Sequence, residues 1–145
     1  MAYFSISIAE KTTFNMKTLI ATILIGSVIA LSSFAQKGNI DDVISAVRSG
    51  NASDLSRHFD ESVDITLPDQ ANTYSKAQAF LILKDFFSNN GVKAFDLKHK
   101  GDNGGGEQYC IGTLQTRSGN FRTTIKMKYK NSRDVLYDIR FQTLE

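Results

Sequence analysis

The sequence predicts a single α+β domain in which helices lie on one face of a curved antiparallel sheet. Three observations predict this class. Most apolar side chains between residues 39 and 90 recur at helical spacing, whereas those after residue 92 alternate with polar ones as in strands. The composition is that of a globular protein, with 41% hydrophobic residues, 22% charged residues and one proline. A length of 145 residues fits one domain.

The first predicted elements are two short helices. Asn39 can cap the first helix, and Gly50 ends it. A second helix, capped by Asn51 or Ser53, would make residues 39–59 a bent helical arm. The apolar residues at helical spacing in this arm are Ile40, Val43, Ile44, Val47, Leu55 and Phe59.

A strand and the clearest helix of the sequence follow. Alternating apolar residues predict a strand over 63–67, which Pro68 stops before the chain turns. Ser75 and Gln78 form an S-x-x-Q capping box, and Gly91 closes the helix that it opens. The predicted broad apolar face of this helix comprises Ala77, Phe80, Leu81, Leu83, Lys84 and Phe87.

The rest of the chain alternates with a period of two. Four strands are predicted, over residues 95–100, 109–116, 121–130 and 135–141. Glycine, asparagine and aspartate mark the connections, at residues 101–106, 118–120 and 131–134. Consecutive strands joined by short turns predict an antiparallel meander.

The N-terminal residues have the pattern of a secretory signal peptide. The apolar run Leu19–Leu31 follows the basic residue Lys17, and the small residues Ser33 and Ala35 predict cleavage after Ala35. A true start at Met16 would place Lys17 in the expected n-region. The run is shorter than the about 20 residues of a spanning helix, which disfavours the alternative of an uncleaved membrane anchor.

The pattern predicts an exported protein, periplasmic or secreted, whose residues 36–145 form one domain with no permanent membrane anchor after cleavage. Cys110 is the only cysteine, so no internal disulfide forms, and we expect this thiol to be buried. We expect no metal and no cofactor. The net charge is −3 over residues 36–91 and +4 over residues 92–145. This positive charge is too small to predict nucleic-acid binding.

Several runs carry a family resemblance, and they cover essentially all of residues 38–142. These runs are Ser49-Gly50-Asn51, Leu55-Ser56-Arg57-His58-Phe59-Asp60, Asp64-Ile65-Thr66-Leu67-Pro68-Asp69, Tyr74-Ser75-Lys76-Ala77-Gln78, Leu83-Lys84-Asp85-Phe86-Phe87, His99-Lys100-Gly101, Gln108-Tyr109-Cys110-Ile111-Gly112-Thr113-Leu114 and Ile139-Arg140-Phe141. They resemble the domain of unknown function 4783 family, small exported bacterial proteins best known from Bacteroidetes. The resemblance implies a cone-like, nuclear-transport-factor-2-like (cystatin-like) fold and carries over no catalytic residue.

Related folds include enzymes that hold acid/base groups inside the cone, so residues of that chemistry are candidate catalytic groups. His99 is in phase with the apolar residues of its strand, which makes it the better pocket candidate, although it lacks a positioned partner. Asp64 and Asp96 are out of phase with their apolar neighbours and are expected to point away from the core. Tyr74 and Tyr109 could act as hydrogen-bond donors.

Two further sets of residues are candidates for binding. The ligand-binding set consists of inward-facing apolar residues, namely Phe80, Phe95, Tyr109, Phe121, Ile125, Tyr129 and Phe141. The second set forms a basic strand face, namely Arg122, Lys126, Lys128, Lys130 and Arg140. Such a face is either a solvated surface that discourages aggregation or a docking surface for an acidic partner.

Three functions are compatible with these patterns. The first is non-enzymatic binding of a small apolar ligand or an envelope protein, in the cone pocket or on the sheet face, with a sheet-to-sheet homodimer as a further possibility. The second is a lyase- or isomerase-like enzyme that uses a pocket His or Asp with a Tyr. The third is a structural role in which the cone is filled by its own side chains.

Overall fold

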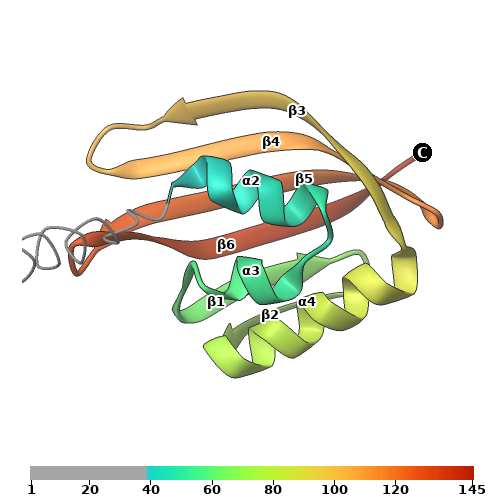
Figure 1. The fold of residues 1–145 in the computed structure, drawn as a ribbon, viewed down its shortest axis with the longest axis horizontal. Coiled ribbons are helices and arrows are strands. Elements are labelled where there is room, and N and C mark those ends of the chain that lie inside the picture. Colours follow the sequence, from blue (N-terminus) through green and yellow to red (C-terminus); the bar gives the residue numbers. More distant parts are fainter. Residues whose placement is uncertain (1–38) are drawn as a thin grey trace, which may run out of the picture. The chain divides into compact units, whose positions relative to one another are not determined.

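A computed structural model of the chain describes residues 39–145 (Figure 1). The helices in this region are α2 (Ile40–Arg48), α3 (Ala52–Ser56) and α4 (Lys76–Asn90). The strands are β1 (Phe59–Leu67), β2 (Gln70–Ser75), β3 (Val92–Asp102), β4 (Glu107–Thr116), β5 (Gly119–Lys130) and β6 (Arg133–Leu144). The predicted signal peptide and its cleavage site lie outside the described residues.

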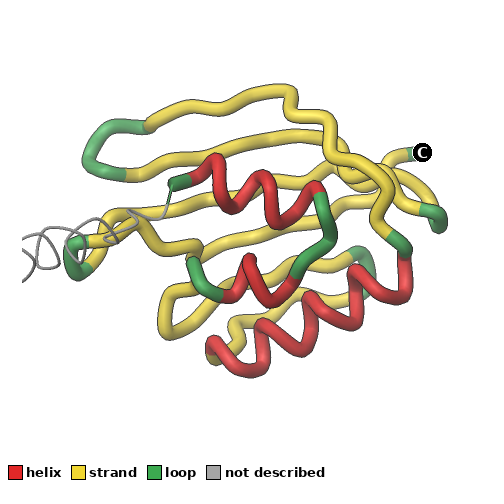
Figure 2. Tube along the Cα trace, in the orientation of Figure 1, coloured by secondary structure: helices red, strands yellow, loops and turns green. Residues whose placement is uncertain are grey.

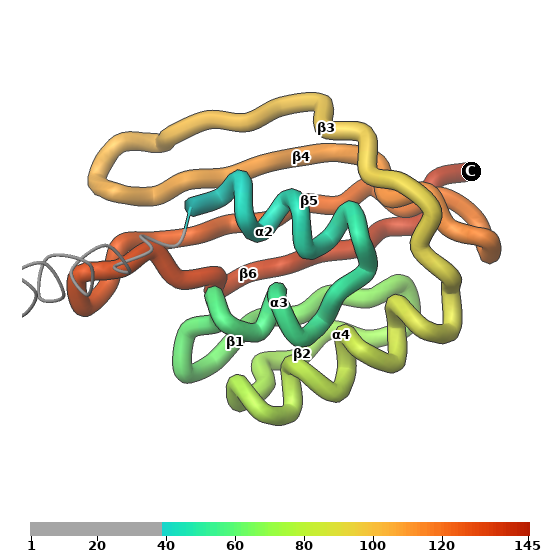
Figure 3. Tube along the Cα trace, viewed as in Figure 1, coloured from blue at the N-terminus to red at the C-terminus, as the bar shows by residue number. Residues whose placement is uncertain are grey.

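The strands form one six-stranded curved sheet in the order β2-β1-β6-β5-β4-β3 (Figure 3). Strands β3 to β6 are the predicted antiparallel meander. Strand β1 lies parallel to β6, and β2 pairs antiparallel with β1 and forms one edge of the sheet. The helices lie on one face of this sheet (Figure 2), so the predicted α+β class is confirmed.

Two predicted element boundaries were wrong. The helical arm ends earlier than expected, because α3 stops at Ser56 and Phe59 already belongs to β1, where it pairs with Leu136. The residues after Pro68, predicted only to turn, form β2. The sequence does not predict β2, because five of its six side chains are exposed and its apolar residues do not alternate with polar ones.

Local signals explain the helix ends. Asn39 and Asn51 each accept a hydrogen bond from a main-chain N–H in the first turn of their helix. Ser75 and Gln78 form the predicted capping box of α4. Gly91 ends α4 with a positive φ of 67°, a conformation that residues with a Cβ rarely adopt.

The core lies between the helices and the sheet face that they cover, which we call the inner face. Phe86 and Phe87 of α4 contact Phe141 of β6, with ring centroids 4.5 Å and 6.1 Å apart, and Phe86 also meets Phe121 of β5 at 5.3 Å. The predicted apolar face of α4 was partly wrong. Leu81 is 55% exposed and Ala77 is exposed, whereas the buried residues of α4 are Ala79, Leu83, Phe86 and Phe87.

Two β-bulges change which side chains face the core. The register of β3 against β4 shifts between Leu97 and His99, and this shift moves His99 to the same side as its partner Ile111, away from the core. The register of β5 against β6 shifts between Lys126 and Met127. Leu136 therefore enters the core, whereas strict alternation from Ile139 and Phe141 would place it on the opposite face.

Candidate functional site

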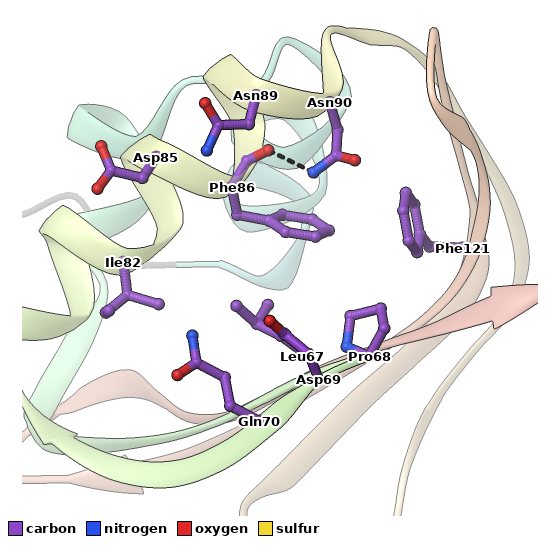
Figure 4. Close-up of a pocket in the computed structure, with 10 residues that line it drawn as sticks. All are labelled: Leu67, Pro68, Asp69, Gln70, Ile82, Asp85, Phe86, Asn89, Asn90 and Phe121. Atoms are coloured by element: carbon purple, nitrogen blue, oxygen red, sulfur yellow. Dashed lines mark hydrogen bonds between the residues drawn. The ribbon is translucent and has the colours of Figure 1, made fainter.

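One concavity in the described region of the chain combines core side chains with a polar rim, and we call it the turn cavity (Figure 4). It has a volume of about 370 Å³ and lies between the C-terminal half of α4, the β1–β2 turn and the start of β5. It is lined by Leu67, Pro68, Asp69, Gln70, Ile82, Asp85, Phe86, Asn89, Asn90 and Phe121.

The floor of the turn cavity is continuous with the core. Leu67, Phe86 and Phe121 are 7–9% exposed and belong to the buried cluster, and Ile82 packs against that cluster. Figure 4 shows the ring of Phe86 pointing across the space toward Phe121. Because Phe86 also contacts Phe141, the floor cannot move without disturbing the core.

The helix end beside the turn cavity is fixed by hydrogen bonds. The Asn90 side-chain amide donates to the carbonyl of Phe86 at 2.8 Å, and the Ser118 hydroxyl donates to the carbonyl of Asn90 at 3.4 Å. The main-chain N–H of Arg117 donates to the carbonyl of Gly91 at 3.0 Å. The β4–β5 hairpin thus supplies donors for the carbonyls that the last turn of α4 leaves without helical partners.

The rim of the turn cavity is polar and acidic. Asp69 and Gln70 come from the β1–β2 turn, while Asp85 and Asn89 come from α4. In Figure 4 the Gln70 side chain points from β2 toward α4. The lining contains two carboxylates and no basic, histidine or tyrosine side chain. Such a site favours a positive charge next to an apolar group.

A second cavity of about 450 Å³ lies between the α2–α3 connection and α4. Residues 49–53 line one side of it, and Phe80, Lys84 and Ser88 of α4 line the other. The Lys84 ammonium lies 5.8 Å from the centre of the Phe80 ring. Phe80 is the one large apolar side chain of this lining, so the cavity has little apolar floor.

The structure does not bring the predicted ligand-binding residues together. Phe121 lines the turn cavity and Phe80 lines the second cavity. The others are dispersed. Phe95, Ile125 and Phe141 are buried in the core, Tyr109 is half-buried on the opposite sheet face, and Tyr129 is 56% exposed. Side chains fill the space between helices and sheet, where the sequence had suggested a pocket.

Tyr109 does not lie on the inner face as predicted, and Tyr129 is not buried there. Tyr109 pairs with Lys126, whose side chain reaches Asp138 on the uncovered face, and its ring lies across Gly101, where an added Cβ would come within 2.8 Å of the phenol oxygen. Tyr129 has the inward phase, but it pairs with Asp134 close to the β5–β6 turn, and more than half of its surface stays exposed.

The candidate catalytic residues lie on the sheet face that the helices leave uncovered, which we call the outer face. His99 is exposed there because of the bulge in β3. Asp96 forms an ion pair with Lys98 at 2.5 Å, and Asp64 accepts a hydrogen bond from Thr73 at 2.5 Å. Neither of the two cavities is lined by any of these groups.

Tyr74, the other candidate hydrogen-bond donor, is half-buried. It packs against the edge of the core from β2. It therefore lies on the inner side of the sheet edge and apart from His99.

Two buried aspartates organise the predicted basic face. Asp60 binds Lys128 at 3.1 Å and Lys130 at 2.8 Å, although its own side chain is only 7% exposed. Burial alone would raise the pKa of Asp60, but hydrogen bonds from Lys130, from the following main-chain N–H and from Lys128 outweigh it and lower the pKa to about 2. The same hydrogen bond raises the pKa of Lys130.

Asp138 has the same role in the neighbouring strand β6. Arg140 binds its carboxylate through two nitrogens, at 3.0 Å and 2.8 Å, and Lys126 lies 3.8 Å from it. The pKa of Arg140 is raised by this hydrogen-bonded pairing. The sequence did not predict that these two aspartates bind the basic side chains. Strand alternation indicates on which face a side chain lies, but it does not indicate which cation forms an ion pair with it.

Tyr137 and Glu107 form a further pair on this face. The phenol of Tyr137 donates a hydrogen bond to the Glu107 carboxylate, which lowers the pKa of Glu107. Burial, followed by this hydrogen bond, raises the pKa of Tyr137 to about 12. The Lys128 ammonium lies 4.8 Å from the centre of the Tyr137 ring. The predicted basic face is therefore a network of paired charges except at Arg122, which is exposed and forms no ion pair within the described residues.

Two other titratable groups have shifted pKa values. Cys110 is a free, fully buried cysteine, as predicted, and burial raises the pKa of its thiol to about 12. Burial also lowers the pKa of His58.

Within residues 39–145 no group of three or more histidine, cysteine or carboxylate side chains could hold a metal ion. No helix among those residues is long and apolar enough to cross a membrane.

Comparison with known proteins identifies the family. The model of DUF4783, a domain of unknown function, matches residues 40–142. The chain belongs to the DUF4783 family. The predicted resemblance is thereby confirmed, and it extends over nearly all of the described structure. A search of curated proteins found no match.

Solved structures of DUF4783 proteins have the same fold. One from Bacteroides uniformis is 28% identical, with a TM-score of 0.69, and the match covers 72% of this chain and 96% of that one. One from Bacteroides ovatus is 26% identical, with a TM-score of 0.70 and coverage of 77% and 99%. A nuclear-transport-factor-2-like protein of unknown function from Cytophaga hutchinsonii is 8% identical, with a TM-score of 0.53 and coverage of 72% and 86%. The predicted nuclear-transport-factor-2-like fold is confirmed.

Proposed function

We propose that this DUF4783 chain is an exported, non-enzymatic binding domain and that the turn cavity is its binding site. The signal-peptide pattern of residues 16–35 supports export. The observation that carries the binding proposal is the composition of the cavity, in which an apolar floor lies beside two carboxylates and no basic side chain. The ligand is therefore an apolar group that carries a positive charge.

The size of the turn cavity agrees with this function. Its volume of about 370 Å³ falls at the lower end of the range of ligand pockets, about 300 to 1,000 Å³. The floor is held by the core and by the hydrogen bonds at the end of α4, so little conformational freedom is lost on binding. A preformed, shallow site of this kind suits one apolar side chain or a small amphipathic molecule.

Small probes of equal length test the charge preference. We expect hexylamine to shift the NMR resonances of residues around the turn cavity at lower concentration than hexanol does, and hexanoate to shift them least. The Asp69→Asn and Asp85→Asn variants should lose the preference for hexylamine. Asp96→Asn, which removes a carboxylate on the outer face, is the matched control and should keep it. Equal shifts for all three probes, or shifts located elsewhere, would overturn the proposal.

The outer face is the second candidate surface, for an acidic partner or for a second copy of the chain. Lys128 and Lys130 share Asp60, while Lys126 and Arg140 share Asp138, so much of the positive charge is already matched. This pairing weakens the attraction for an acidic partner. Sedimentation at several protein concentrations would test the homodimer separately from the cavity.

The enzymatic alternative receives less support from the geometry. A lyase or isomerase needs an acid or base beside a hydrogen-bond donor in a site that excludes water. His99, Asp96 and Tyr109 instead lie on the outer face, and the turn cavity is lined by no histidine or tyrosine. A turnover that His99→Ala abolishes would restore this alternative.

A further inference from the structure

The two edges of the sheet differ in how they are protected. The β3 edge carries Lys93, Asp96, Lys98 and Lys100, and two register shifts interrupt its pairing with β4. Charges and bulges of this kind prevent a further strand from adding to an edge. The β3 edge is therefore closed to other chains.

The β2 edge has none of these features. Its sequence, Gln70–Ser75, contains no charged residue, proline or glycine. It pairs with β1 over six consecutive positions without a register shift. Within residues 39–145, the main chain of Gln70–Tyr74 makes no hydrogen bond apart from those to β1. Every second residue of such a strand directs its N–H and C=O outward, where a further strand can bind them.

The β2 edge and the turn cavity form one continuous surface. Gln70 is the first residue of β2 and also lines the cavity, directly after Asp69. Across the cavity, Ile82, Asp85 and Asn89 lie on one face of α4, because they are three, four and seven residues apart. A strand added to β2 would direct every second side chain toward this face of α4.

Charge decides between the possible occupants of this surface. Neither Asp69 nor Asp85 forms an ion pair within the described residues. A second copy of the chain, pairing β2 with β2, would bring no cation from β2 itself, because that strand is uncharged, and its nearest basic residue, Lys76, already belongs to α4. A peptide with a lysine or arginine would satisfy both the unpaired carboxylates and the unpaired main chain.

We propose that the β2 edge accepts an extended peptide of a partner protein, which adds a strand to the sheet and places a lysine or arginine near Asp69 and Asp85. The inference rests on the proposed function, because the turn cavity receives the apolar side chain next to that cation. Main-chain hydrogen bonds give the strand its affinity, while Ile82 and the two aspartates select its side chains.

Peptide selection and main-chain methylation test the proposal. A random peptide library is selected on the full chain, and the best peptide is synthesised with each amide N-methylated in turn. Methylation should weaken binding at least tenfold at every second position and much less at those between, because only alternate amides face β2. Replacing the lysine or arginine by norleucine, or Asp69 and Asp85 by asparagine, should also weaken binding at least tenfold, whereas Asp96→Asn should not.

Hydrogen exchange separates the possible failures. On peptide binding, amides of β2 should gain protection while those of the β3 edge should not. If the peptide binds at the turn cavity but methylation has no alternating effect and β2 gains no protection, strand addition is wrong and the proposed function stands. If neither peptides nor hexylamine bind there, both are wrong. If β2 gains protection as protein concentration rises without peptide, a second copy is the occupant and the peptide proposal fails.

Discussion

The two faces of the sheet are built from the same strands but are stabilised in different ways. The inner face carries aromatic and aliphatic side chains that α4 covers, and Phe86, Phe87 and Phe141 meet there. The outer face carries lysines and an arginine arranged around two buried aspartates. Burial of apolar area fixes the first face, whereas hydrogen-bonded charges order the second. We therefore expect substitutions on the two faces to differ in size and in pH dependence.

The largest effect is expected from Phe141→Ala on the inner face. Phe141 is fully buried, and removing its ring leaves a cavity beside Phe86 and Phe87. Such changes lower the free energy of unfolding by about 3–5 kcal/mol, which urea titration measures. Tyr129→Ala is the control, since a side chain that is 56% exposed should contribute less than about 0.5 kcal/mol. Equal losses for both variants would show that burial of the ring does not set the size of the loss.

A smaller, pH-dependent effect is expected from Asp60→Asn on the outer face. The variant loses the carboxylate that Lys128 and Lys130 share, and at pH 7 it should be about 1–3 kcal/mol less stable. The pKa of Asp60 is lowered to about 2, so its stabilisation is complete above the ordinary aspartate pKa and is lost as the pH falls through that value toward 2. Wild type and variant should therefore converge in acid.

The measurement for Asp60 is the free energy of unfolding at pH 7, 4 and 2.5. Asp64→Asn is the matched control on the same face, because Asp64 is exposed and its amide replacement can still accept from Thr73. We expect a change below about 0.5 kcal/mol for this control. A difference between wild type and Asp60→Asn that stays constant across this pH range would show that the aspartate acts by its shape and not by its charge.

Much of the inner face could be predicted from the sequence. Alternation placed Phe95, Phe121, Ile125 and Phe141 correctly, because each lies in a stretch without a register shift. Alternation assigns His99 and Leu136 to the wrong face, because one extra residue at each bulge reverses the alternation. Nothing in the local composition indicates a bulge. A β-bulge is therefore the feature of this sheet that strand alternation does not predict.

The candidate site was much harder to predict than the fold. The turn cavity joins Asp69, Asp85 and Phe121, which are far apart in the sequence and belong to three different elements. No sequence motif around any of these three residues indicates that the other two lie nearby in the fold. The ligand-binding residues were chosen only for facing inward, and the residues that face inward most completely are those that fill the core. A binding site at a rim needs side chains that are partly exposed, and strand periodicity does not identify these.

The smallest effect concerns the start of α4, the helix that covers the inner face. In Ser75→Ala the helix loses the capping hydroxyl, which accepts from the Gln78 N–H at 3.4 Å. Both bonds of this capping box are long and exposed, so we expect a loss of about 0.5–1 kcal/mol in urea titration. Ser53→Ala, at an exposed serine whose side chain makes no such bond, should change little. If Ser75→Ala instead costs as much as Phe141→Ala, helix initiation and not aromatic burial would hold α4 on the sheet.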